Sequence, residues 1–286
     1  MKVRFAGQDC AGPLPVSPGE RGLLLGDGVF ETILALNGRP VWLSDHLDRL
    51  LAAVSVLGLK AARPELEREV RAVIGPEPGV IRLTVMRGDG PRGLAAGGQS
   101  GTPVLASFSP LSAGTIRAPV RLAVSAVRRN EGSPASRLKT LSYLDNILAA
   151  REAVSRGADC ALMLNNTGHV ACVSTGNIFA VSGSKLLTPP GSEGVLAGIA
   201  RKHILECALR LGLAPAEEPL RVEDLTAADE VFMTNSLRLV SPVTELDGFP
   251  LKRTADAVVE RLFSVLCKSV VSETSYDPRS LAAPGI

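Results

Sequence analysis

A single lysine stands directly before a segment with a helical pattern. In LKTLSYLDNILAAREA, Lys139 precedes apolar residues that recur at helical spacing: Leu144, Ile147, Leu148 and Val154. Ser142 and Asp145 have the spacing of a capping box, so the pattern predicts a rigid helix over 142–156. The positive end of that helix and the neighbouring Arg137 would disfavour the charged form of Lys139 and leave a nucleophilic amine. An ordinary solvated lysine is the alternative interpretation.

Three other segments offer groups that bind anions. Small residues in GVLAGIA, residues 194–200, lead into a predicted helix whose first N–H groups have no partner within the helix. The turn TNS, residues 234–236, follows a strand, and Arg49 lies on an earlier predicted helix. Each of these features alone is commonly structural. Together with the amine of Lys139 they fit a phosphorylated aldehyde, and pyridoxal 5'-phosphate is a cofactor of that kind.

The composition excludes several classes of protein. The chain has 286 residues, 45% of them hydrophobic, and its net charge of +2 is too weak for a nucleic-acid or membrane-surface binder. The five cysteines form no CxxC or CxxH pattern, so neither a metal site nor a redox pair is indicated. No apolar run approaches membrane-spanning length and the start MKVRFAG lacks a signal-peptide pattern, so we expect a soluble, cytoplasmic protein.

The chain is expected to form two domains and a tail. Residues 1–119 are predicted to form an N-terminal α/β domain, residues 120–272 a C-terminal α+β domain, and residues 273–286 a flexible tail. The polar segment RRNEGSPAS, residues 128–136, is typical of a connection between domains.

Periodicity and turn residues predict the elements that must position these groups. A hairpin is expected over 30–42 with its turn at Asn37 and Gly38, and a glycine-rich loop over 88–101. Helices are expected at about 44–57 with Ser44 as the cap, 65–73, 199–211 and 255–270, and strands at 80–87, 104–108, 120–125, 160–164, 169–173, 178–181, 185–188 and 230–233. The irregular order in the second half argues against a doubly wound parallel sheet and favours a mixed, barrel-like α+β domain.

Six segments in this order resemble those of the class IV, fold-type IV pyridoxal-phosphate enzymes. That family includes branched-chain aminotransferases, D-amino-acid aminotransferases and 4-amino-4-deoxychorismate lyases. The segments lie between about residues 20 and 250: RGLLLGDGVFET, DHLDRL, LKTLSYLDN, STGNIF, GVLAGIAR and VFMTNSL. The resemblance implies a small N-terminal α/β domain, a C-terminal pseudo-barrel, a cofactor between them, and a homodimer whose partner contributes to the site.

The resemblance also implies roles for individual residues. Lys139 would form the Schiff base with the cofactor and later move the proton, and Arg49 would bind the phosphate. Backbone N–H groups and one hydroxyl would complete the phosphate site, from Ile199, Ala200, Thr234 and Asn235. Tyr143 matches a tyrosine that contacts the phenolic oxygen of the cofactor, although its spacing from the lysine is one residue shorter than in branched-chain enzymes.

One position departs from the family pattern. Most members carry a glutamate two residues before the serine of STGNIF, where it pairs with the protonated pyridine nitrogen, whereas this chain has Cys172. A carboxylate keeps the ring a strong electron sink, and a neutral thiol does not. Transamination depends on that sink more than elimination does, so Cys172 favours a lyase or a family member with weakened activity. A small buried cysteine on a strand is the structural alternative.

The substrate side lacks the complete carboxylate trap of the D-amino-acid enzymes. Phe30 stands where those enzymes carry a tyrosine and Leu94 where they carry a histidine, while Arg92 is retained. The GDGPRGL loop is more similar to the glycine-rich loop of the deoxychorismate lyases, whose carboxylated substrate Arg92 can bind. Arg238 is a second candidate for the same role.

We therefore predict a lyase of folate biosynthesis that eliminates pyruvate from 4-amino-4-deoxychorismate and leaves 4-aminobenzoate. One alternative is an aminotransferase for branched-chain or D-amino acids. The other is a family member that keeps the fold but has lost turnover because of Cys172. The expected partner is a small amino-bearing carboxylate, and no metal, nucleic acid or membrane partner is expected.

Overall fold

The computed structural model describes residues 1–95, 101–254 and 257–283, which form two compact units. Unit 1 draws its described residues from Met1–Ser112, Leu138–Ser142 and Glu273–Tyr276, and unit 2 from the intervening segments and the residues after Tyr276. The units differ from the domains expected from the sequence, because unit 1 ends before residue 119 and includes two later segments. One of these segments contains Lys139.

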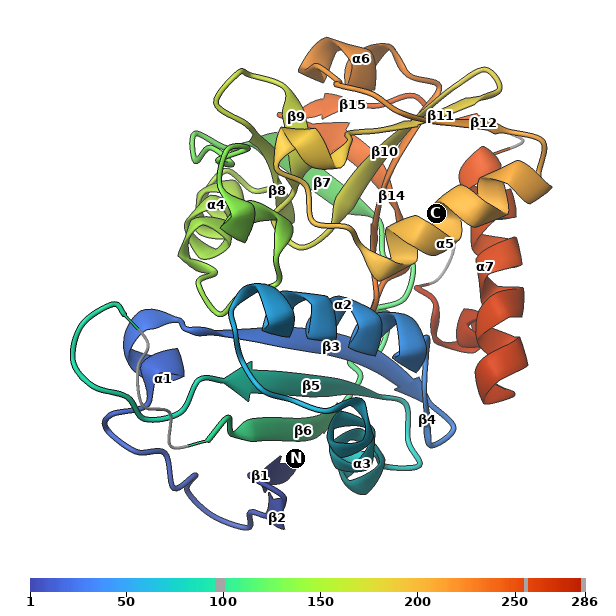
Figure 1. Cartoon of the computed structure of the whole chain (residues 1–286). Helices are drawn as coiled ribbons and strands as arrows, with labels where there is room; N and C mark the ends of the chain where they lie inside the picture. Colours follow the sequence, from blue (N-terminus) through green and yellow to red (C-terminus); the bar gives the residue numbers. More distant parts are fainter. Residues whose placement is uncertain (96–100, 255–256, 284–286) are drawn as a thin grey trace. The chain divides into compact units, whose positions relative to one another are not determined.

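Unit 1 is built on a six-stranded antiparallel sheet with the order β2-β1-β6-β5-β3-β4 (Figure 1). Its strands are β1 Lys2–Phe5, β2 Gln8–Asp9, β3 Gly28–Leu36, β4 Arg39–Pro40, β5 Gly79–Met86 and β6 Val104–Pro110. The hairpin of β3 and β4 turns at Asn37 and Gly38, which have φ angles of 52° and 69°. The Asn-Gly signal supplies the positive φ that such a turn requires, and the predicted hairpin is confirmed.

Two helices cover one face of this sheet. The apolar sides of α2 (Leu43–Val56) and α3 (Arg63–Val73) pack against alternate residues of the strands, including Val29 and Ile33 of β3. Because side chains of a strand alternate between its two faces, Glu31 points to the same covered face as Val29 and Ile33. The sheet therefore carries a carboxylate into the core between its strands and the two helices.

Unit 2 contains a mixed sheet with the order β12-β11-β10-β13-β14-β7-β8-β9, to which β15 adds by pairing with β14 (Figure 1). The strands are β7 Val120–Val124, β8 Cys160–Leu164, β9 Val170–Val173, β10 Asn177–Ser182, β11 Lys185–Thr188, β12 Ala214–Glu217, β13 Glu230–Asn235, β14 Leu239–Leu246 and β15 Phe249–Pro250. A backbone bridge between Val173 and Gly176 joins β9 to the start of β10, so the sheet curls back toward its other edge. The predicted pseudo-barrel is confirmed.

The remaining helical elements complete the two units. They are α1 Arg21–Leu25 in unit 1, and η1 Pro134–Arg137, α4 Leu144–Ser155, η2 Gly191–Glu193, α5 Ile199–Arg210, α6 Val222–Ala227, α7 Val258–Thr274 and η3 Pro278–Leu281. The expected tail thus contains the end of α7 and the short helix η3. Two expectations lie partly outside the described residues: the start of the last helix at Ala255, and part of the loop over 88–101.

Two predicted helix caps are wrong. Helix α2 follows Trp42, not Ser44, and the Trp42 N–H donates to Oε2 of Glu273 (2.7 Å). Helix α4 follows Tyr143, not Ser142, and the Tyr143 side chain caps no N–H group. In both cases a polar residue near the helix start suggested a cap, but the N-cap lies two residues before Ser44 in α2 and one residue after Ser142 in α4.

The larger apolar side chains of α4 also point away from the core of unit 2. Leu144 and Val154 are 64% and 65% exposed, and Ile147 and Leu148 are nearly half exposed. The helix packs through small residues such as Ala149. The helical spacing correctly predicted a helix. It wrongly predicted which face of that helix is buried within the chain.

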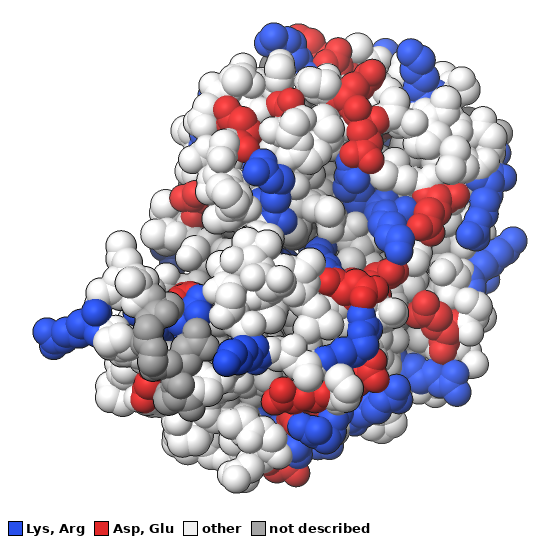
Figure 2. All heavy atoms as spheres, viewed as in Figure 1, with Lys and Arg blue, Asp and Glu red and all other residues white. Residues whose placement is uncertain are grey.

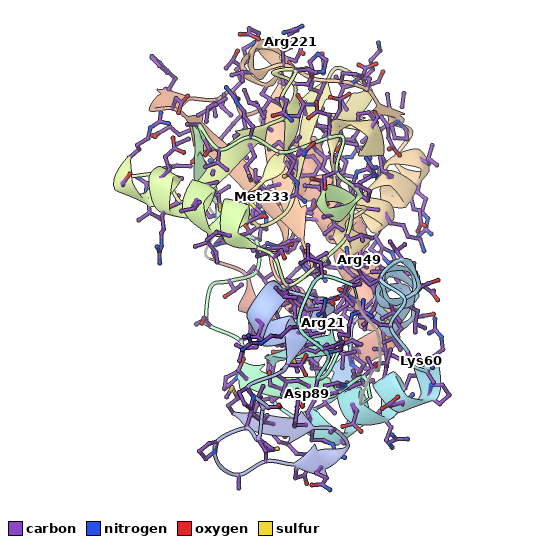
Figure 3. The ribbon with its side chains drawn as sticks, turned by 60° about the vertical axis from the view of Figure 1, so that its left-hand side comes forward. Arg21, Arg49, Lys60, Asp89, Arg221 and Met233 are labelled. Carbon is purple, nitrogen blue, oxygen red and sulfur yellow. The ribbon has the colours of Figure 1, made fainter. Side chains whose placement is uncertain are left out.

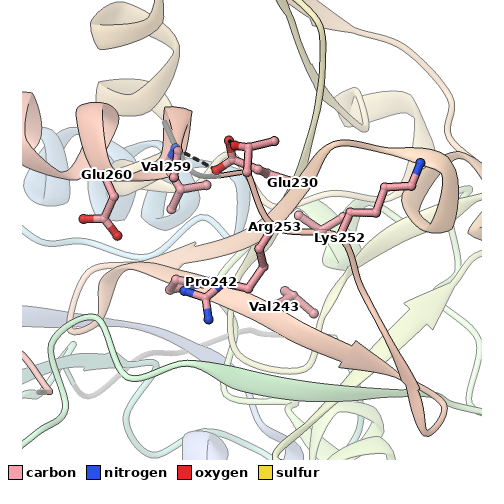
Figure 4. A pocket seen from close by; sticks show the side chains of 10 residues that line it. Glu230, Pro242, Val243, Lys252, Arg253, Val259 and Glu260 are labelled. Atoms are coloured by element: carbon pink, nitrogen blue, oxygen red, sulfur yellow. Dashed lines mark hydrogen bonds between the residues drawn. The ribbon is translucent and has the colours of Figure 1, made fainter. Parts of the chain in front are cut away.

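A buried carboxylate caps the N-terminus of α7. Oε1 of Glu230 accepts hydrogen bonds from the Val258 N–H (2.8 Å) and the Thr254 hydroxyl (2.6 Å), and Oε2 accepts from the Val259 N–H (3.1 Å) (Figure 4). These N–H groups have no acceptor within the helix. Glu230 also lines the pocket drawn in Figure 4, so this pocket is part of the helix cap and lies apart from the predicted site residues.

We expect Glu230→Ala to lower the free energy of unfolding by about 2 kcal/mol, because it leaves the first N–H groups of α7 without an acceptor. The exposed Glu218 serves as the control, since Glu218→Ala removes the same atoms from the surface. Urea unfolding of both variants checks the prediction. Equal losses in the two variants would show that the cap contributes nothing.

Candidate active site

Lys139 is held by strand pairing. Its carbonyl accepts the N–H of Phe30 (2.9 Å), and the N–H of Leu141 donates to the carbonyl of Gly28 (2.9 Å). Residues 139–141 thereby pair antiparallel with the first residues of β3. The sequence placed Lys139 at the mouth of a capped helix, but the pairing with β3 holds its backbone.

The ring of Phe30 contacts two cations. The Nζ atom of Lys139 lies 4.4 Å from the ring centroid, and the guanidinium carbon of Arg82 lies 3.3 Å from it. These contacts are attractive because the face of an aromatic ring is electronegative. Phe30 is buried, so its ring is a fixed surface that orients the Lys139 amine. The residue predicted to contact substrate thus contacts the predicted catalytic lysine.

Arg49 forms a bidentate ion pair with the buried Glu31. Its Nε donates to Oε1 of Glu31 (2.7 Å) and its terminal nitrogen to Oε2 (2.6 Å). His46, one turn earlier on α2, places Nδ1 2.7 Å from the same Oε2. The parallel geometry fixes the plane of the guanidinium, which is the property that recognition of an oxyanion requires. Figure 3 labels Arg49 among the side chains of this unit.

The protonation states of this triad follow from its contacts. Burial opposes ionisation of Glu31, but the charge of Arg49 and the hydrogen bonds from His46 and Arg49 outweigh it and lower the pKa to about 2. Burial also lowers the pKa of His46, against the opposing effect of Glu31. His46 is therefore neutral at neutral pH and donates from Nδ1, and its Nε2 has no hydrogen-bond partner among the described residues.

Glu31 and His46 were not predicted as site residues, although the sequence holds a signal for them. Glu31 interrupts the apolar run VFETILAL of a strand, and His46 and Arg49 are three residues apart on one helix. A charged residue at a core position of a strand requires a partner of opposite charge. Only the packing of α2 on β3 identifies that partner as Arg49.

The start of α5 in unit 2 supplies unpaired donors. Gly198 occupies the N-cap position and no side chain caps the helix, so the first N–H groups, at Ile199 and Ala200, are not satisfied within α5. A Cβ at Gly198 would lie 2.0 Å from the amide oxygen of Asn177, so only glycine allows this approach. Asn177 pairs with Thr234 across β10 and β13. The helix start and Thr234 therefore lie close together.

Thr234 offers a hydroxyl that the protein itself does not use. The residue is fully buried, and its Oγ1 has no hydrogen-bond partner among the described residues. A buried hydroxyl without a partner costs stability unless a ligand satisfies it. An unused hydroxyl beside free helix N–H groups fits a phosphate, which binds at such positions.

Two further predicted residues make contacts within the protein. The Asn235 side chain donates to the carbonyl of Thr175 (3.2 Å) and accepts the N–H groups of Leu237 and Arg238 (3.0 and 2.8 Å). The Arg238 guanidinium donates to the carbonyl of Ala118 (3.3 Å). The Asn235 side chain therefore shapes the turn, which leaves the backbone as the part able to reach an anion.

Cys172 lies on β9 in a small apolar cluster. The residue is 7% exposed and packs in one cluster with Met163, Ala171 and Val195. Burial raises the pKa of the Cys172 thiol, and the charge of Arg129 acts in the opposite direction. Since the net direction is upward, the thiol is neutral at neutral pH. Cys172 is therefore a small buried residue on a strand, and the charge of the nearby Arg129 is a feature that the sequence did not indicate.

The loop that carries Arg92 is anchored by Arg21. The Arg21 guanidinium, labelled in Figure 3, is buried and donates to the carbonyls of Pro91, Gly93 and Leu94 (3.4, 2.8 and 3.1 Å). It also donates to Asp27 (3.2 Å). Arg92 and Leu94 themselves are exposed in the described chain. The backbone of this loop is fixed by unit 1, whereas its side chains contribute to no described cluster.

The predicted residues thus fall into two groups, one in each unit. Unit 1 brings together Lys139, Phe30 and Arg49 with its partner Glu31. Unit 2 brings together the start of α5, Thr234 and Asn235, and places Cys172 near Arg129. Tyr143 is half buried at the start of α4.

The surface of the described chain carries charged side chains of both signs (Figure 2). On the face drawn in Figure 2, basic and acidic side chains are interspersed over both units. Among the helices that the structure describes, none has the length and apolar character needed to cross a lipid bilayer.

Comparisons with known proteins bear on this site. The family model for amino-transferase class IV matches residues 28–246. A putative branched-chain-amino-acid aminotransferase of Methanocaldococcus jannaschii is 35% identical over 242 residues, which are 82% of this chain and 83% of that protein. An aminodeoxychorismate lyase of Bacillus subtilis is 29% identical over 239 residues, which are 81% of this chain and 82% of that one.

A solved structure gives the same result for the fold. The branched-chain aminotransferase from the archaeon Thermoproteus uzoniensis, crystallised with norvaline, superposes with a TM-score of 0.86 at 31% sequence identity. The match covers 97% of each chain. The similar proteins therefore include both an aminotransferase and a lyase by name.

Proposed function

Because the chain belongs to the amino-transferase class IV family, we propose that it is a lyase that eliminates pyruvate from an amino-bearing carboxylate such as 4-amino-4-deoxychorismate. The chain is an enzyme of a family that works with pyridoxal 5'-phosphate. The observation that carries the choice of reaction is Cys172, a buried neutral thiol at the position where the family motif has a glutamate.

The residues of the two groups suit this cofactor. In unit 2 we assign phosphate binding to the Thr234 hydroxyl and to the N–H groups at the start of α5. In unit 1 we assign anion binding to Arg49 and the aldehyde to Lys139, as the family resemblance implies. Supporting observations are the buried Thr234 hydroxyl without a partner and the guanidinium of Arg49 held in one plane by Glu31. When bound, the cofactor supplies an aldehyde for the substrate amine and a conjugated ring that accepts electrons.

Lys139 serves as the base. Its neutral amine takes the proton from the amine-bearing carbon of the substrate, and the electron pair of that bond forms a new double bond in the substrate ring. The carbon–oxygen bond to the three-carbon side group breaks, and its electron pair leaves with the enolate of pyruvate. The Lys139 ammonium then returns the proton to that enolate.

Aromatisation explains why a neutral thiol suffices in this reaction. The substrate ring becomes aromatic 4-aminobenzoate, so the electrons of the broken carbon–hydrogen bond remain in the substrate and need no storage elsewhere. In transamination the substrate amino acid has no group that can take up these electrons. A carboxylate at position 172 would then be required, because it keeps the cofactor ring a strong electron sink. Cys172 thus favours the elimination.

The assay follows from this reaction. Purified protein supplied with pyridoxal 5'-phosphate and aminodeoxychorismate is expected to release pyruvate and 4-aminobenzoate in equal amounts. Pyruvate is measured with a coupled dehydrogenase and 4-aminobenzoate by its fluorescence. If neither product forms while the cofactor is bound, the lyase proposal fails.

An aminotransferase is the second candidate, since aminotransferases as well as lyases are among the similar proteins by name. It predicts that the protein transfers the amino group of a branched-chain or D-amino acid to a keto acid, measured as the newly formed amino acid. A transfer that appears only in Cys172→Glu would instead identify the natural chain as a family member whose turnover has been weakened.

Thr234→Val should separate cofactor binding from stability. The valine removes a hydroxyl that has no protein partner, so the apo-protein should be as stable as wild type or more stable. The Kd for pyridoxal 5'-phosphate should rise about 10-fold to 100-fold, since one hydrogen bond to a charged group is lost. Urea unfolding of the apo-protein and a cofactor titration measure the two quantities.

Thr188→Val is the matched control. Thr188 is equally buried, but its hydroxyl donates to the carbonyl of Ile178 (2.8 Å). This variant should lose about 1 kcal/mol of stability and keep its cofactor affinity. If both threonine variants lose affinity equally, Thr234 has no specific role.

A homodimer is proposed from the exposed side of α4. The apolar side chains of Leu144, Ile147, Leu148 and Val154 are exposed along this helix, and contiguous exposed apolar surface of this kind marks an interface. Light scattering should therefore give twice the mass of the chain. Leu148→Asp should shift the distribution toward monomer, whereas Leu209→Asp, at an exposed leucine on α5, should not.

A further inference from the structure

The segment Gly194–Ala200 connects two parts of unit 2. At one end the Arg129 Nε donates to the carbonyl of Gly194 (3.2 Å), and Val195 packs in the cluster of Cys172. In the middle the carbonyl of Leu196 accepts the side chain of Asn177 (2.9 Å). At the other end the segment begins α5 beside Thr234. The segment therefore runs from the Cys172 thiol and the Arg129 guanidinium to the proposed phosphate site at Thr234.

Both ends of the segment Gly194–Ala200 lie on the outer side of the curled sheet of unit 2. Val170 and Val173 of β9 and Met233 of β13 belong to the cluster that fills the interior of the sheet. Cys172 belongs instead to the cluster beneath α4, and Thr234, next to Met233, points to the opposite side from it. A ligand whose phosphate lies at Thr234 and whose body follows this segment therefore approaches Cys172.

The charge at the Cys172 end is positive and has no carboxylate partner. Arg129 donates to the carbonyls of Gly194 and Ser136 and to the amide oxygen of Asn146 (3.2, 2.5 and 3.2 Å). All three acceptors are neutral, and Arg129 forms no ion pair with any residue that the structure describes. A fixed cation without a counter-ion disfavours a second positive charge nearby.

Three acidic groups of the surrounding elements are engaged elsewhere, and Asp145 at the start of α4 is exposed. Glu131 accepts the two N–H donors of Asn166 (both 3.1 Å), and Glu193 accepts the side chain of Asn165 (2.5 Å) and contacts His169 (3.1 Å). On α4, Glu152 accepts the Ser125 hydroxyl (2.6 Å). Each of these three carboxylates is oriented by its own partner, so none takes the place that a family glutamate would have at position 172.

We propose that Cys172 and Arg129 hold the pyridine nitrogen of the bound cofactor in its unprotonated form. This inference rests on the proposed function, because it requires the cofactor in the orientation assigned above. It narrows the substrates to compounds that carry their own outlet for electrons, namely a leaving group on the carbon next to the amine-bearing carbon. Ordinary amino acids, which lack that outlet, would then be poor substrates.

The test is the NMR chemical shift of an isotope-labelled ring nitrogen in the reconstituted protein. In wild type the shift should be that of a free pyridine and should stay constant between about pH 6 and about pH 9. Cys172→Glu should move it to the value of a pyridinium. At about pH 6, Arg129→Gln should move the chemical shift part of the way toward the pyridinium value, because the positive charge that opposes protonation of the ring nitrogen is gone.

Two control variants accompany these. Cys172→Ser keeps a small neutral group and should leave the shift unchanged. Glu193→Gln removes the neighbouring carboxylate and should also leave it unchanged, since that carboxylate is engaged by Asn165 and His169.

The wild-type spectrum decides the proposal even if a variant does not fold. A pyridinium shift in wild type overturns it, and so does a shift that stays the same in both Cys172→Glu and Arg129→Gln. A protein that takes up no cofactor gives no ring signal, and that outcome refutes the proposed function instead.

Discussion

Lys139→Ala is expected to abolish covalent attachment of the cofactor and to lower kcat at least about 1,000-fold, because the amine serves as both attachment point and base. The attachment is measured by borohydride reduction, after which the wild-type chain should gain the mass of the reduced cofactor and the variant should not. Turnover is measured as pyruvate release. Because the backbone of Lys139, not its side chain, pairs with β3, the variant should stay folded.

Lys185→Ala is the matched control for this experiment. Lys185 is an exposed lysine on β11 of unit 2, and its loss should affect neither attachment nor turnover. A Lys139→Ala protein that still gains the cofactor mass after reduction, at the same stoichiometry as wild type, would rule out Lys139 as the attachment site.

Glu31→Ala is expected to have the second largest effect. It removes the anion that Arg49 and His46 share inside unit 1, and loss of one partner of a buried ion pair costs about 3–5 kcal/mol. The free energy of unfolding should fall by that amount in urea. Cofactor affinity should fall as well, because the guanidinium of Arg49 loses the bidentate contact that fixes its plane.

Two comparisons isolate this effect. Glu67 on α3 lies in the same unit, is half buried, and approaches Arg63 only to 3.9 Å, so Glu67→Ala should cost less than about 1 kcal/mol. Glu31→Gln keeps the shape of the side chain and loses only its charge. Equal stability of wild type and Glu31→Ala would mean that the triad is not a structural element of the folded protein.

The same ion pair predicts a pH dependence. The folded-state pKa of Glu31 is about 2, below the ordinary value of 4.5, so ionised Glu31 stabilises the fold at any pH above the ordinary value. As the pH falls from about 4.5 to about 2, the unfolded chain binds a proton that the folded chain does not, and this contribution is lost. The difference in unfolding free energy between wild type and Glu31→Gln should therefore shrink over that range.

The candidate site was largely predictable where its signal is local. LKTLSYLDN, GVLAGIAR and VFMTNSL identified Lys139, the start of α5 and Thr234, and the structure places free donors at the last two. Such segments are recognisable because a helix start, a turn and a reactive side chain need only a few consecutive residues.

The errors arose where distant segments decide the outcome. Backbone pairing with residues about 110 positions earlier in the chain holds Lys139 in place. No local pattern near Lys139 reveals that pairing. The apolar residues of α4 have the spacing of a buried face, yet the small alanines pack inward. Hydrophobic spacing identifies a helix but does not say which of two apolar sides the rest of the chain will cover.

By itself the sequence determined which elements form, their order, and the types of residue available for chemistry, because periodicity, turn residues and motifs act over short stretches of chain. Only the tertiary structure decided the partners of the charged groups. Glu31 meets Arg49 across 18 residues and Arg129 meets Gly194 across 65, and each contact depends on how separate elements pack. The charge around Cys172 follows from that packing, since burial and pairing are set by neighbours in space.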